Sequence, residues 1–238
     1  MTDVTVLLRR LDAFDNRPDA AALRERGYDL LRPEPGHVIA DIGCGGGRAA
    51  HELAQHGVTS HGVDPSDVMI DAARSRWADA QFHLAPAERL PFDDGSLDGY
   101  RADKVLHALD DPRAAIDEAR RVLRPGGRAM LVGQDWDLLA VDADDPDLTR
   151  RLLRARAAAV PSPNIARGYS NLLRDNGFTD ITAEVHTMLP PPEAVLGSFD
   201  QLGDEMPEIH DWLAEQRQRV ETGRWFMAMP MFLAAGTR

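Results

Sequence analysis

Residues 37–48 of this 238-residue chain read His37-Val38-Ile39-Ala40-Asp41-Ile42-Gly43-Cys44-Gly45-Gly46-Gly47-Arg48. The apolar run indicates a buried parallel strand, four of the next five residues are glycine, and a helical pattern follows. A strand, a glycine turn and a helix together begin a nucleotide-binding βαβ unit. Glycine suits the turn because the backbone needs unusual dihedral angles there and because a ligand can approach without meeting Cβ atoms. The amides exposed at the start of the helix favour polar or anionic ligand groups.

The composition is typical of one α/β domain. Apolar residues make up 43% of the chain, which is enough for a full core. The balance of 27 basic against 39 acidic residues gives a net charge of −12, which argues against nucleic acid as a partner. The single cysteine, Cys44, excludes an internal disulfide. No apolar segment near the N-terminus has the length of a signal peptide or membrane span, so we expect a cytoplasmic protein without a membrane partner.

Strands and helices alternate regularly through the first half of the chain. We expect strands at residues 38–42, 58–63, 80–84, 97–101 and 128–133, and helices at residues 48–56, 66–77 and 112–123. Strands that are separated by helices of about ten residues predict a parallel sheet with right-handed crossovers.

The flanking segments are less regular. Residues 1–33 predict two helices broken at Asp15-Asn16-Arg17-Pro18, which would cap one sheet edge or cover the ligand as a lid. Further on, we expect helices at 147–159 and 169–176 and strands at 181–188 and 224–235. Residues 190–223 begin with three prolines and contain an amphipathic helix at 208–222, and they predict a substrate cover. With no linker or repeat, residues 1–238 form one predicted domain around a core at 36–135.

The glycine spacing bears on the type of nucleotide. The dinucleotide fingerprint requires glycine at the first, third and sixth positions, but the sixth residue counted from Gly43 is Arg48. A pyrophosphate cradle is therefore not required. Asp64 ends the second strand, where it would accept hydrogen bonds from ribose hydroxyls; alternatively it caps the helix that begins near Ser66. Asp41 lies at an apolar strand end and needs polar partners if it is buried.

Four blocks extend this pattern. They are Val38-Ile39-Ala40-Asp41-Ile42-Gly43-Cys44-Gly45-Gly46-Gly47, Gly62-Val63-Asp64-Pro65-Ser66, Ala87-Glu88-Arg89-Leu90-Pro91-Phe92-Asp93-Asp94-Gly95-Ser96-Leu97-Asp98 and Leu123-Arg124-Pro125-Gly126-Gly127-Arg128. In order and spacing they resemble the class I S-adenosylmethionine-dependent methyltransferases, in the small-molecule branch that includes quinone C-methyltransferases. The resemblance implies a Rossmann-like α/β three-layer sandwich whose seven-stranded, mostly parallel sheet has its last strand antiparallel.

The resemblance also implies roles for individual residues toward S-adenosyl-L-methionine. Those expected at the methionine moiety are Asp41, Gly43, Cys44, Gly45 and, largely through its backbone, Arg101. Those expected at the ribose and adenine are Asp64, Pro65, Met69, Ala87 and Glu88. The chain departs from the family at Ala85-Pro86, where relatives often carry Gly-Asp before the Ala-Glu pair. This cofactor has no phosphate, which agrees with the incomplete dinucleotide fingerprint.

Candidate catalytic and substrate residues follow the fourth and fifth strands. His107 would act as a base or hydrogen-bond donor to the methyl acceptor, or it is a structural histidine. Asp135 would activate a hydroxyl or amine, and Trp136 would either wall an apolar acceptor or pack beneath the helical layer. Asp103 and Lys104 are expected to face solvent. Further candidates for the substrate pocket are Phe14 and Trp212, although the apolar stripe that contains Trp212 is also typical of core.

The remaining features add no second chemistry. Cys44 is interpreted as a small packed residue, and His83, His186 and His210 lack ligand spacing, so we expect no metal. We therefore predict methyl transfer from S-adenosylmethionine to a small, apolar or aromatic metabolite, in a setting such as natural-product tailoring. The attacking atom (oxygen, nitrogen or carbon) and the oligomeric state stay open. The alternatives are a cyclase or decarboxylase of the same fold that retains the cofactor, a nicotinamide-dependent oxidoreductase, and a catalytically inactive partner subunit.

Overall fold

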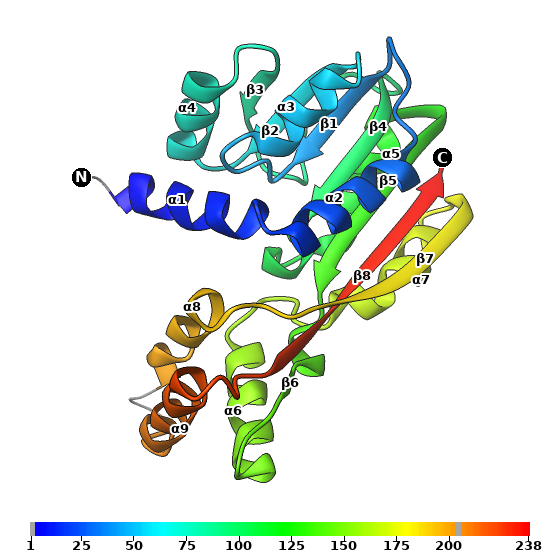
Figure 1. Ribbon diagram of the computed structural model, residues 1–238. Helices are drawn as coiled ribbons and strands as arrows, with labels where there is room; N and C mark the ends of the chain where they lie inside the picture. Colours follow the sequence, from blue (N-terminus) through cyan, green and yellow to red (C-terminus); the bar gives the residue numbers. More distant parts are fainter. Residues whose placement is uncertain (1–2, 203–205) are drawn as a thin grey trace.

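The computed structural model of the protein describes residues 3–202 and 206–238 (Figure 1). Two predicted segments are therefore described only in part. Residues 1–2 of the expected cap at 1–33 and residues 203–205 of the expected insertion at 190–223 lie outside the described residues. The strands are β1 Val38–Ile42, β2 Thr59–Asp64, β3 Gln81–Leu84, β4 Leu97–Asp103, β5 Leu123–Gln134, β6 Ala140–Val141, β7 Thr179–Met188 and β8 Met227–Thr237. The α-helices are α1 Asp3–Asp15, α2 Pro18–Leu31, α3 Arg48–Gln55, α4 Asp67–Arg76, α5 Pro112–Val122, α6 Pro146–Ala158, α7 Tyr169–Asp175, α8 Pro192–Val195 and α9 Ile209–Glu221. Short 3-10 helices are η1 Leu106–Ala108, η2 Trp136–Leu138, η3 Ile165–Gly168, η4 Leu196–Ser198 and η5 Asp200–Leu202.

One twisted sheet organises the molecule. Its order is β3-β2-β1-β4-β5-β8, with β7 on the far side of β8, and the first five strands are parallel. β8 is antiparallel to both of its neighbours, β5 and β7, which confirms the predicted antiparallel last strand. The two-residue strand β6 also pairs with the start of β8. The strand order reverses between β1 and β4, and ligands of open α/β sheets bind at the carboxyl ends beside such a reversal.

Helices cover both faces of the sheet. Met130 of β5 packs with Leu23 of α2 in the core on one face, whereas the next residue, Leu131, packs with Ile116 of α5 on the other. Side chains alternate in this way because successive residues of a strand point to opposite faces. Helices α2, α3 and α4 form the first outer layer and α5 and α7 the second (Figure 1). The predicted three-layer sandwich is therefore confirmed.

A small helical unit lies beyond the carboxyl ends of the strands. It comprises α6, α8 and α9, which gather where β8 begins (Figure 1). Phe199, Trp212 and Leu213 are at most 2% exposed in its own apolar core. Part of the predicted insertion thus packs on α6.

Helix α1 lies along the carboxyl end of the parallel strands (Figure 1). It separates from α2 at Asn16 and Arg17, and Pro18 stands in the first turn of α2, as the sequence predicts. The carboxylate of Asp12 holds α1 against the sheet layer by pairing with Arg48 of α3 and Arg76 of α4. α1 therefore lies over the carboxyl ends of the strands and not at a sheet edge, and its role as a lid over the ligand stays a prediction.

Most observed bounds differ from the predicted ones by one or two residues, and the starts of β5 and β8 differ by more. β5 begins at Leu123 because that residue pairs with Leu97 ahead of a register shift. β8 begins at Met227 rather than at residue 224, because α9 closes through Gly223, whose φ is +69°. β6 and α8 were not predicted, since each is a single short segment without periodicity. Across the part of the chain that the structure describes, no helix is long and apolar enough to span a membrane.

Candidate active site

The glycine turn joins β1 to α3. Gly43 and Cys44 donate backbone hydrogen bonds to the carbonyl of Val63 at 2.7 and 3.0 Å, which holds the turn against β2. The φ of Gly43 is +67°, and a Cβ built there would lie 2.4 Å from Cγ2 of Val105. Gly45 also has a left-handed φ, +51°, but a Cβ there would meet no atom within 4 Å. The turn therefore requires glycine for close packing at Gly43 and for backbone conformation at both positions.

Asp64 connects this turn to the start of α4. Its Oδ2 accepts a hydrogen bond from the Gly45 amide and its Oδ1 accepts one from the Ser66 amide, both at 2.9 Å. The helix cap is Ser66, whose Oγ accepts a hydrogen bond from the Met69 amide at 3.3 Å. Ser66, and not Asp64, is therefore the residue that caps α4. Asp64, 9% exposed, lies at the edge of a cavity.

Asp41 and Arg101 form a buried ion pair beneath the turn. They are partners in the parallel register of β1 and β4, and Nη1 of Arg101 donates to Oδ1 of Asp41 at 2.5 Å. Their exposures are 2% and 3%. Burial raises the pKa of Asp41, and the Arg101 guanidinium opposes that shift. The partner that a buried Asp41 requires is thus Arg101.

Asp103 and Lys104 extend the pair toward solvent. Nη2 of Arg101 donates to Oδ2 of Asp103 at 2.7 Å, and Nζ of Lys104 lies 3.2 Å from Oδ1 of the same carboxylate. Burial acts to raise the pKa of Asp103, but Lys104 and Arg101 outweigh it and lower that pKa. The expectation that Asp103 faces solvent is wrong, because β4 continues two residues beyond the predicted end and its side chain is only 13% exposed.

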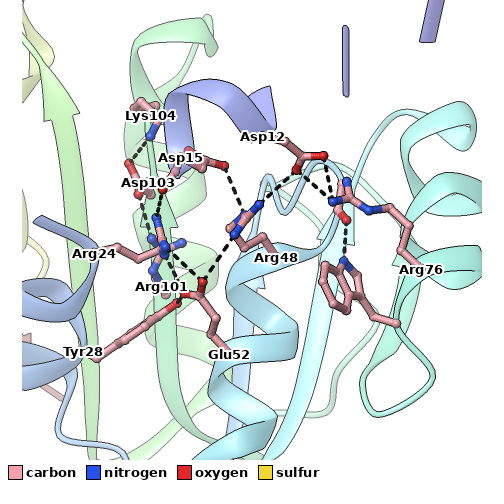
Figure 2. Close-up of polar contacts among 12 residues, drawn as sticks. Asp12, Asp15, Arg24, Tyr28, Arg48, Glu52, Arg76, Arg101, Asp103 and Lys104 are labelled. Atoms are coloured by element: carbon pink, nitrogen blue, oxygen red, sulfur yellow. Dashed lines mark hydrogen bonds and ion pairs between the residues drawn. The ribbon is translucent and has the colours of Figure 1, made fainter. Parts of the chain in front are cut away.

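A second charged cluster links α1 to α3 and α4, as Figure 2 shows. Nη2 of Arg76 lies 2.8 Å and Nη2 of Arg48 3.2 Å from Oδ1 of Asp12, and the two arginines lower the pKa of that carboxyl although burial opposes them. Nearby, Arg24 of α2 pairs with Glu52 of α3 at 2.5 Å. None of these side chains was among the predicted site residues.

Two cavities flank the turn. The first lies beneath α1 and has a volume of about 630 Å³, and the second lies beside β2 with about 890 Å³, each including space open to solvent. Gly43 and Lys104 line both, so the cavities meet at the turn. The predicted methionine-end residues line the first: Asp41, Gly43, Cys44, Gly45 and Arg101. Four of the predicted ribose and adenine residues line the second: Asp64, Pro65, Ala87 and Glu88. The fifth, Met69 on α4, is half-buried and lines neither cavity.

The residues around these cavities fit S-adenosylmethionine. The first cavity is lined by four carboxylates (Asp12, Asp15, Asp41 and Asp103) and by five cationic side chains (Arg24, Arg48, Arg76, Arg101 and Lys104). An amino-acid end group carries both an ammonium and a carboxylate, and both find opposite charges here. Nε of Arg48 is buried without a hydrogen-bond acceptor among the described residues. The second cavity offers the Asp64 carboxylate between apolar walls, as a nucleoside requires.

Lys104 stands where the two cavities meet. Its φ of +60° is in the left-handed region, which non-glycine residues rarely adopt, and its amide donates to the Val132 carbonyl at 2.8 Å. Such backbone strain concentrates at functional sites. The Lys104 ammonium also lies 5.7 Å from the ring centre of Phe14 on α1. The backbone conformation of Lys104 thus places its side chain between the first and second cavities.

A third cavity lies between α1 and α8. Apolar groups dominate its lining, which includes Leu11, Phe14, Pro191 and Ala194. Leu11 also lines the first cavity, so the two are neighbours. Of the predicted substrate residues, Phe14 lies here, whereas Trp212 is buried in the helical unit with its Nε1 donating to Oγ1 of Thr149 at 3.0 Å. The geometry of Trp212 thus fits the core interpretation of its stripe.

His107 and Trp136 meet at the carboxyl ends of β4 and β5. Their ring centres are 5.7 Å apart in an edge-to-face arrangement. Burial lowers the pKa of His107 to about 4, with further lowering by Lys104 and Arg156. Asp135 is fully buried and its two carboxylate oxygens accept hydrogen bonds from Arg167, one at 2.6 Å. Of the two predicted catalytic residues, His107 therefore has the free ring nitrogen, while Asp135 is engaged in an ion pair.

The described residues include no group of three or more His, Cys, Asp or Glu side chains arranged to hold a metal ion. Cys44 is buried in the turn. Burial is the main cause that raises the pKa of its thiol, and the charges of Asp41 and Asp64 raise that pKa further. The thiol is therefore protonated at neutral pH.

Comparison with known proteins identifies the family. Residues 40–131 match the methyltransferase domain family. The O-methyltransferase resE of Aspergillus sclerotiorum is 30% identical over 208 residues, which cover 82% of this chain and 76% of that relative. A longer relative, an uncharacterized 37.1 kDa protein in transposon TN4556 of Streptomyces fradiae, is 35% identical over 71% of this chain. This chain spans about half, 51%, of that relative's length.

Solved structures show the same fold. The YcgJ protein from Bacillus subtilis aligns with a TM-score of 0.68 at 19% identity, over 92% of this chain and 98% of that one. Geranyl diphosphate methyltransferase, solved in complex with S-adenosylmethionine, aligns with a TM-score of 0.59 at 20% identity, over 92% and 85%. The matched domain contains the glycine turn and Asp64, which border the two adjacent cavities. The chain belongs to the class I S-adenosylmethionine-dependent methyltransferases, and S-adenosylmethionine is its cofactor.

Proposed function

We propose that this enzyme methylates a hydroxyl oxygen of a small, apolar or aromatic metabolite. The observation that carries the proposal is the third cavity, whose lining is mainly apolar but also includes Arg10, Arg17 and Glu193. It adjoins the first cavity at Leu11 and has the aromatic ring of Phe14 in its wall. The relative resE is named an O-methyltransferase, which supports oxygen as the attacking atom. The net charge of −12 supports a small-molecule acceptor over nucleic acid. We also propose a cytoplasmic location and a role in natural-product tailoring.

Positioning is the main contribution of the protein to such a reaction. When bound, S-adenosylmethionine supplies a methyl group carried on a positively charged sulfur. Asp41 and Asp15 would bind the ammonium of its amino-acid end, and the cations of the first cavity would bind its carboxylate. Asp64 would bind the ribose in the second cavity. Helix α1 lies over the first cavity, and alignment of reacting groups alone lowers a barrier by about 7–11 kcal/mol.

A proton leaves the acceptor hydroxyl during the transfer, and we assign its removal to His107. The depressed pKa of this histidine, about 4, keeps the ring neutral at pH 7, so one ring nitrogen carries a lone pair. Its Nδ1 is buried without a partner among the described residues. Asp135 is less suited, because Arg167 occupies both of its oxygens. We propose that Asp135 positions the start of η2 instead, through its hydrogen bond from the Asp137 amide at 3.0 Å.

The assay for this function uses the whole chain with labelled S-adenosylmethionine and a panel of phenols, amines and activated carbon acceptors. We expect the label to appear in O-methylated products, identified by mass spectrometry. Exclusive N- or C-methylation would overturn the assignment of the acceptor atom. Cofactor binding with no transfer to any acceptor would instead favour the cyclase or decarboxylase alternative, which the named methyltransferase relatives do not favour.

Thermal denaturation distinguishes a methyltransferase from a nicotinamide-dependent oxidoreductase. A ligand at 100 times its dissociation constant adds about 2.7 kcal/mol to the free energy of unfolding. We expect S-adenosylhomocysteine to raise the melting temperature and nicotinamide adenine dinucleotide to leave it unchanged. Stabilisation by the dinucleotide alone would overturn the assignment.

A further inference from the structure

One cluster beside the cofactor cavities has unmet hydrogen-bonding capacity. His107 of η1, Trp136 of η2 and Arg156 of α6 lie together, with the guanidinium carbon of Arg156 4.5 Å from the ring centre of Trp136. One nitrogen of each side chain is buried and has no partner among the described residues: Nδ1 of His107, Nε1 of Trp136 and Nε of Arg156. Buried polar groups in native proteins are normally paired. Three orphans in one contact cluster therefore require an explanation.

The indole of Trp136 differs from the other tryptophans in this respect. Nε1 of Trp77 donates to the Gly46 carbonyl at 2.9 Å, and Nε1 of Trp225 donates to the Pro190 carbonyl at 3.1 Å. Trp212 donates to Thr149, as described above. Only the Trp136 indole lacks an acceptor within residues 3–202 and 206–238. A buried indole usually finds one.

Arg156 is equally unusual among the arginines. Most half-buried arginines of this chain face a carboxylate, as Arg48, Arg76 and Arg24 do. Arg156 has no carboxylate partner among the described side chains, and burial lowers the pKa of its guanidinium. A desolvated cation without a counter-ion is costly, and an anion that enters the site removes that cost.

The cluster is held in place beside the cofactor cavities. The Ser162 amide donates to the His107 carbonyl at 2.9 Å, and the Trp136 amide donates to the Pro163 carbonyl at 2.9 Å, so one loop holds both segments. Ala108, which follows His107 in η1, lines the second cavity. Lys104, which lines both cofactor cavities, adds a second positive charge that acts on His107. The cluster therefore holds two unpaired N–H donors and a local positive charge, and Ala108 joins it to the wall of the second cavity, although none of its three side chains lines the cavities described above.

We propose that Arg156, Trp136 and His107 form an acceptor subsite that binds an anionic oxygen of the substrate, a carboxylate or an ionised phenol. The inference rests on the proposed methyl transfer to a small molecule and names its substrate class: aromatic acceptors that carry an acidic oxygen. The Arg156 guanidinium and the Trp136 indole donate to that oxygen, and the aromatic face of Trp136 packs against the acceptor ring. In a chain of net charge −12, a local pair of cations is what permits an anion to bind.

The first test measures binding and needs no turnover. Protein saturated with S-adenosylhomocysteine is titrated with 2-hydroxybenzoate, with its uncharged methyl ester, and with 4-nitrophenol above and below its ionisation. The readout is the indole ¹⁵N–¹H signal of Trp136, assigned with Trp136→Phe. We expect the carboxylate to shift this signal and to bind about 10- to 100-fold more tightly than the ester, because hydrogen bonds to charged groups are worth that much. The nitrophenol arm distinguishes phenolate from carboxylate.

The second test removes the cation. Arg156→Met is expected to weaken binding of the carboxylate about 10- to 100-fold and to leave binding of the ester unchanged. Arg156→Lys, which keeps the charge but loses the planar fork, is expected to lie between the two. Arg154→Met is the matched control, since Arg154 is exposed on the same helix without an ion pair among those described, and it should bind like the wild type.

Several results would overturn the proposal. They are equal binding of acid and ester, an unmoved Trp136 signal, equal weakening of both probes by Arg156→Met, or an equal shift of the signal by inorganic phosphate. These results are distinct from a failure of the proposed methyl transfer, because they are measured on the S-adenosylhomocysteine complex. If the carboxylate binds as expected but no acceptor is methylated, the subsite stands and the proposed reaction fails.

Discussion

Asp64→Asn tests the assignment of the ribose site. In the structure the Asp64 carboxylate accepts hydrogen bonds from the Gly45 and Ser66 amides and lies at the wall of the second cavity. Asparagine has nearly the same shape, and its amide oxygen retains one of the two backbone hydrogen bonds. The substitution therefore removes the negative charge and one acceptor while it changes the packing little. Alanine would leave both amides unpaired, so it would confuse folding with binding.

The expected magnitude follows from these contacts. A hydrogen bond from a ribose hydroxyl to a carboxylate is worth about 1.5–3 kcal/mol, and its loss weakens binding about 10- to 150-fold. Loss of one buried backbone partner lowers the free energy of unfolding by about 1–3 kcal/mol. We therefore expect a large loss of cofactor affinity together with a smaller, measurable loss of stability.

Isothermal titration with S-adenosylhomocysteine measures the affinity, and urea denaturation measures the stability of the same sample. Asp67→Asn is the matched control, because Asp67 is an exposed carboxylate three residues further along whose Oδ1 bonds only the Val68 amide among the contacts described. The control should bind like the wild type. If Asp64→Asn binds S-adenosylhomocysteine with wild-type affinity, Asp64 only braces the glycine turn and the ribose assignment is wrong.

Three further substitutions test the turn, the buried pair and the histidine. Gly43→Ala should lower the free energy of unfolding by about 2–4 kcal/mol, because the φ of this residue is left-handed and the added Cβ would meet Val105. The control Gly36→Ala, at φ +88° with no atom within 4 Å of the added Cβ, should lower it by only about 1–2 kcal/mol. Equal urea midpoints for the two variants would contradict this reasoning. Arg101→Met leaves the buried carboxylate of Asp41 unpaired and leaves Asp103 with Lys104 alone, so it should cost about 3–5 kcal/mol in thermal denaturation, and an unchanged melting temperature would refute the pairing. The pKa of His107 is about 4 in the folded protein and near 6.5 in the unfolded chain, so between these pH values the unfolded chain binds more protons. The free energy of unfolding should therefore fall as the pH falls from about 6.5 to about 4, by at most about 3 kcal/mol. His107→Gln should lack that part of the pH dependence, and parallel stability curves for the two proteins would show that the histidine titrates normally despite Lys104, Arg156 and Asp103 beside it.

Sequence predicted the elements around the glycine turn well because their signals are local. β1 has the predicted bounds, Val38–Ile42, since an apolar run followed by glycines marks both ends of the strand. Asp64 and Glu88 follow neighbouring strands, and the carboxyl ends of parallel strands meet at one edge, so the structure brings both to one cavity. Chain order and strand direction are sufficient to infer this proximity.

The ion pairs between α1 and helices α3 and α4 could not be predicted in the same way. Asp12 meets Arg48 and Arg76 at separations of 36 and 64 residues, and no periodicity links positions so far apart. Arg156 was missed for a related reason, since α6 is rich in arginine and only its packing against Trp136 distinguishes this one. For Trp212, an apolar stripe on a helix has the same pattern whether it faces a core or a ligand.

The buried pair of Asp41 and Arg101 connects the fold to the chemistry. An apolar pair of similar size would stabilise adjacent strands at least as well, because desolvation offsets most of the attraction between buried charges. Stability therefore does not explain two charges that are each about 97% buried at the centre of the sheet. We propose that they serve the site, since Asp41 lines the first cavity and Arg101 also fixes Asp103 there. Register places these groups at the reversal of strand order, where Arg101 and Lys104 balance the two carboxylates, and we propose that this set of paired charges orients the amino-acid end of the cofactor.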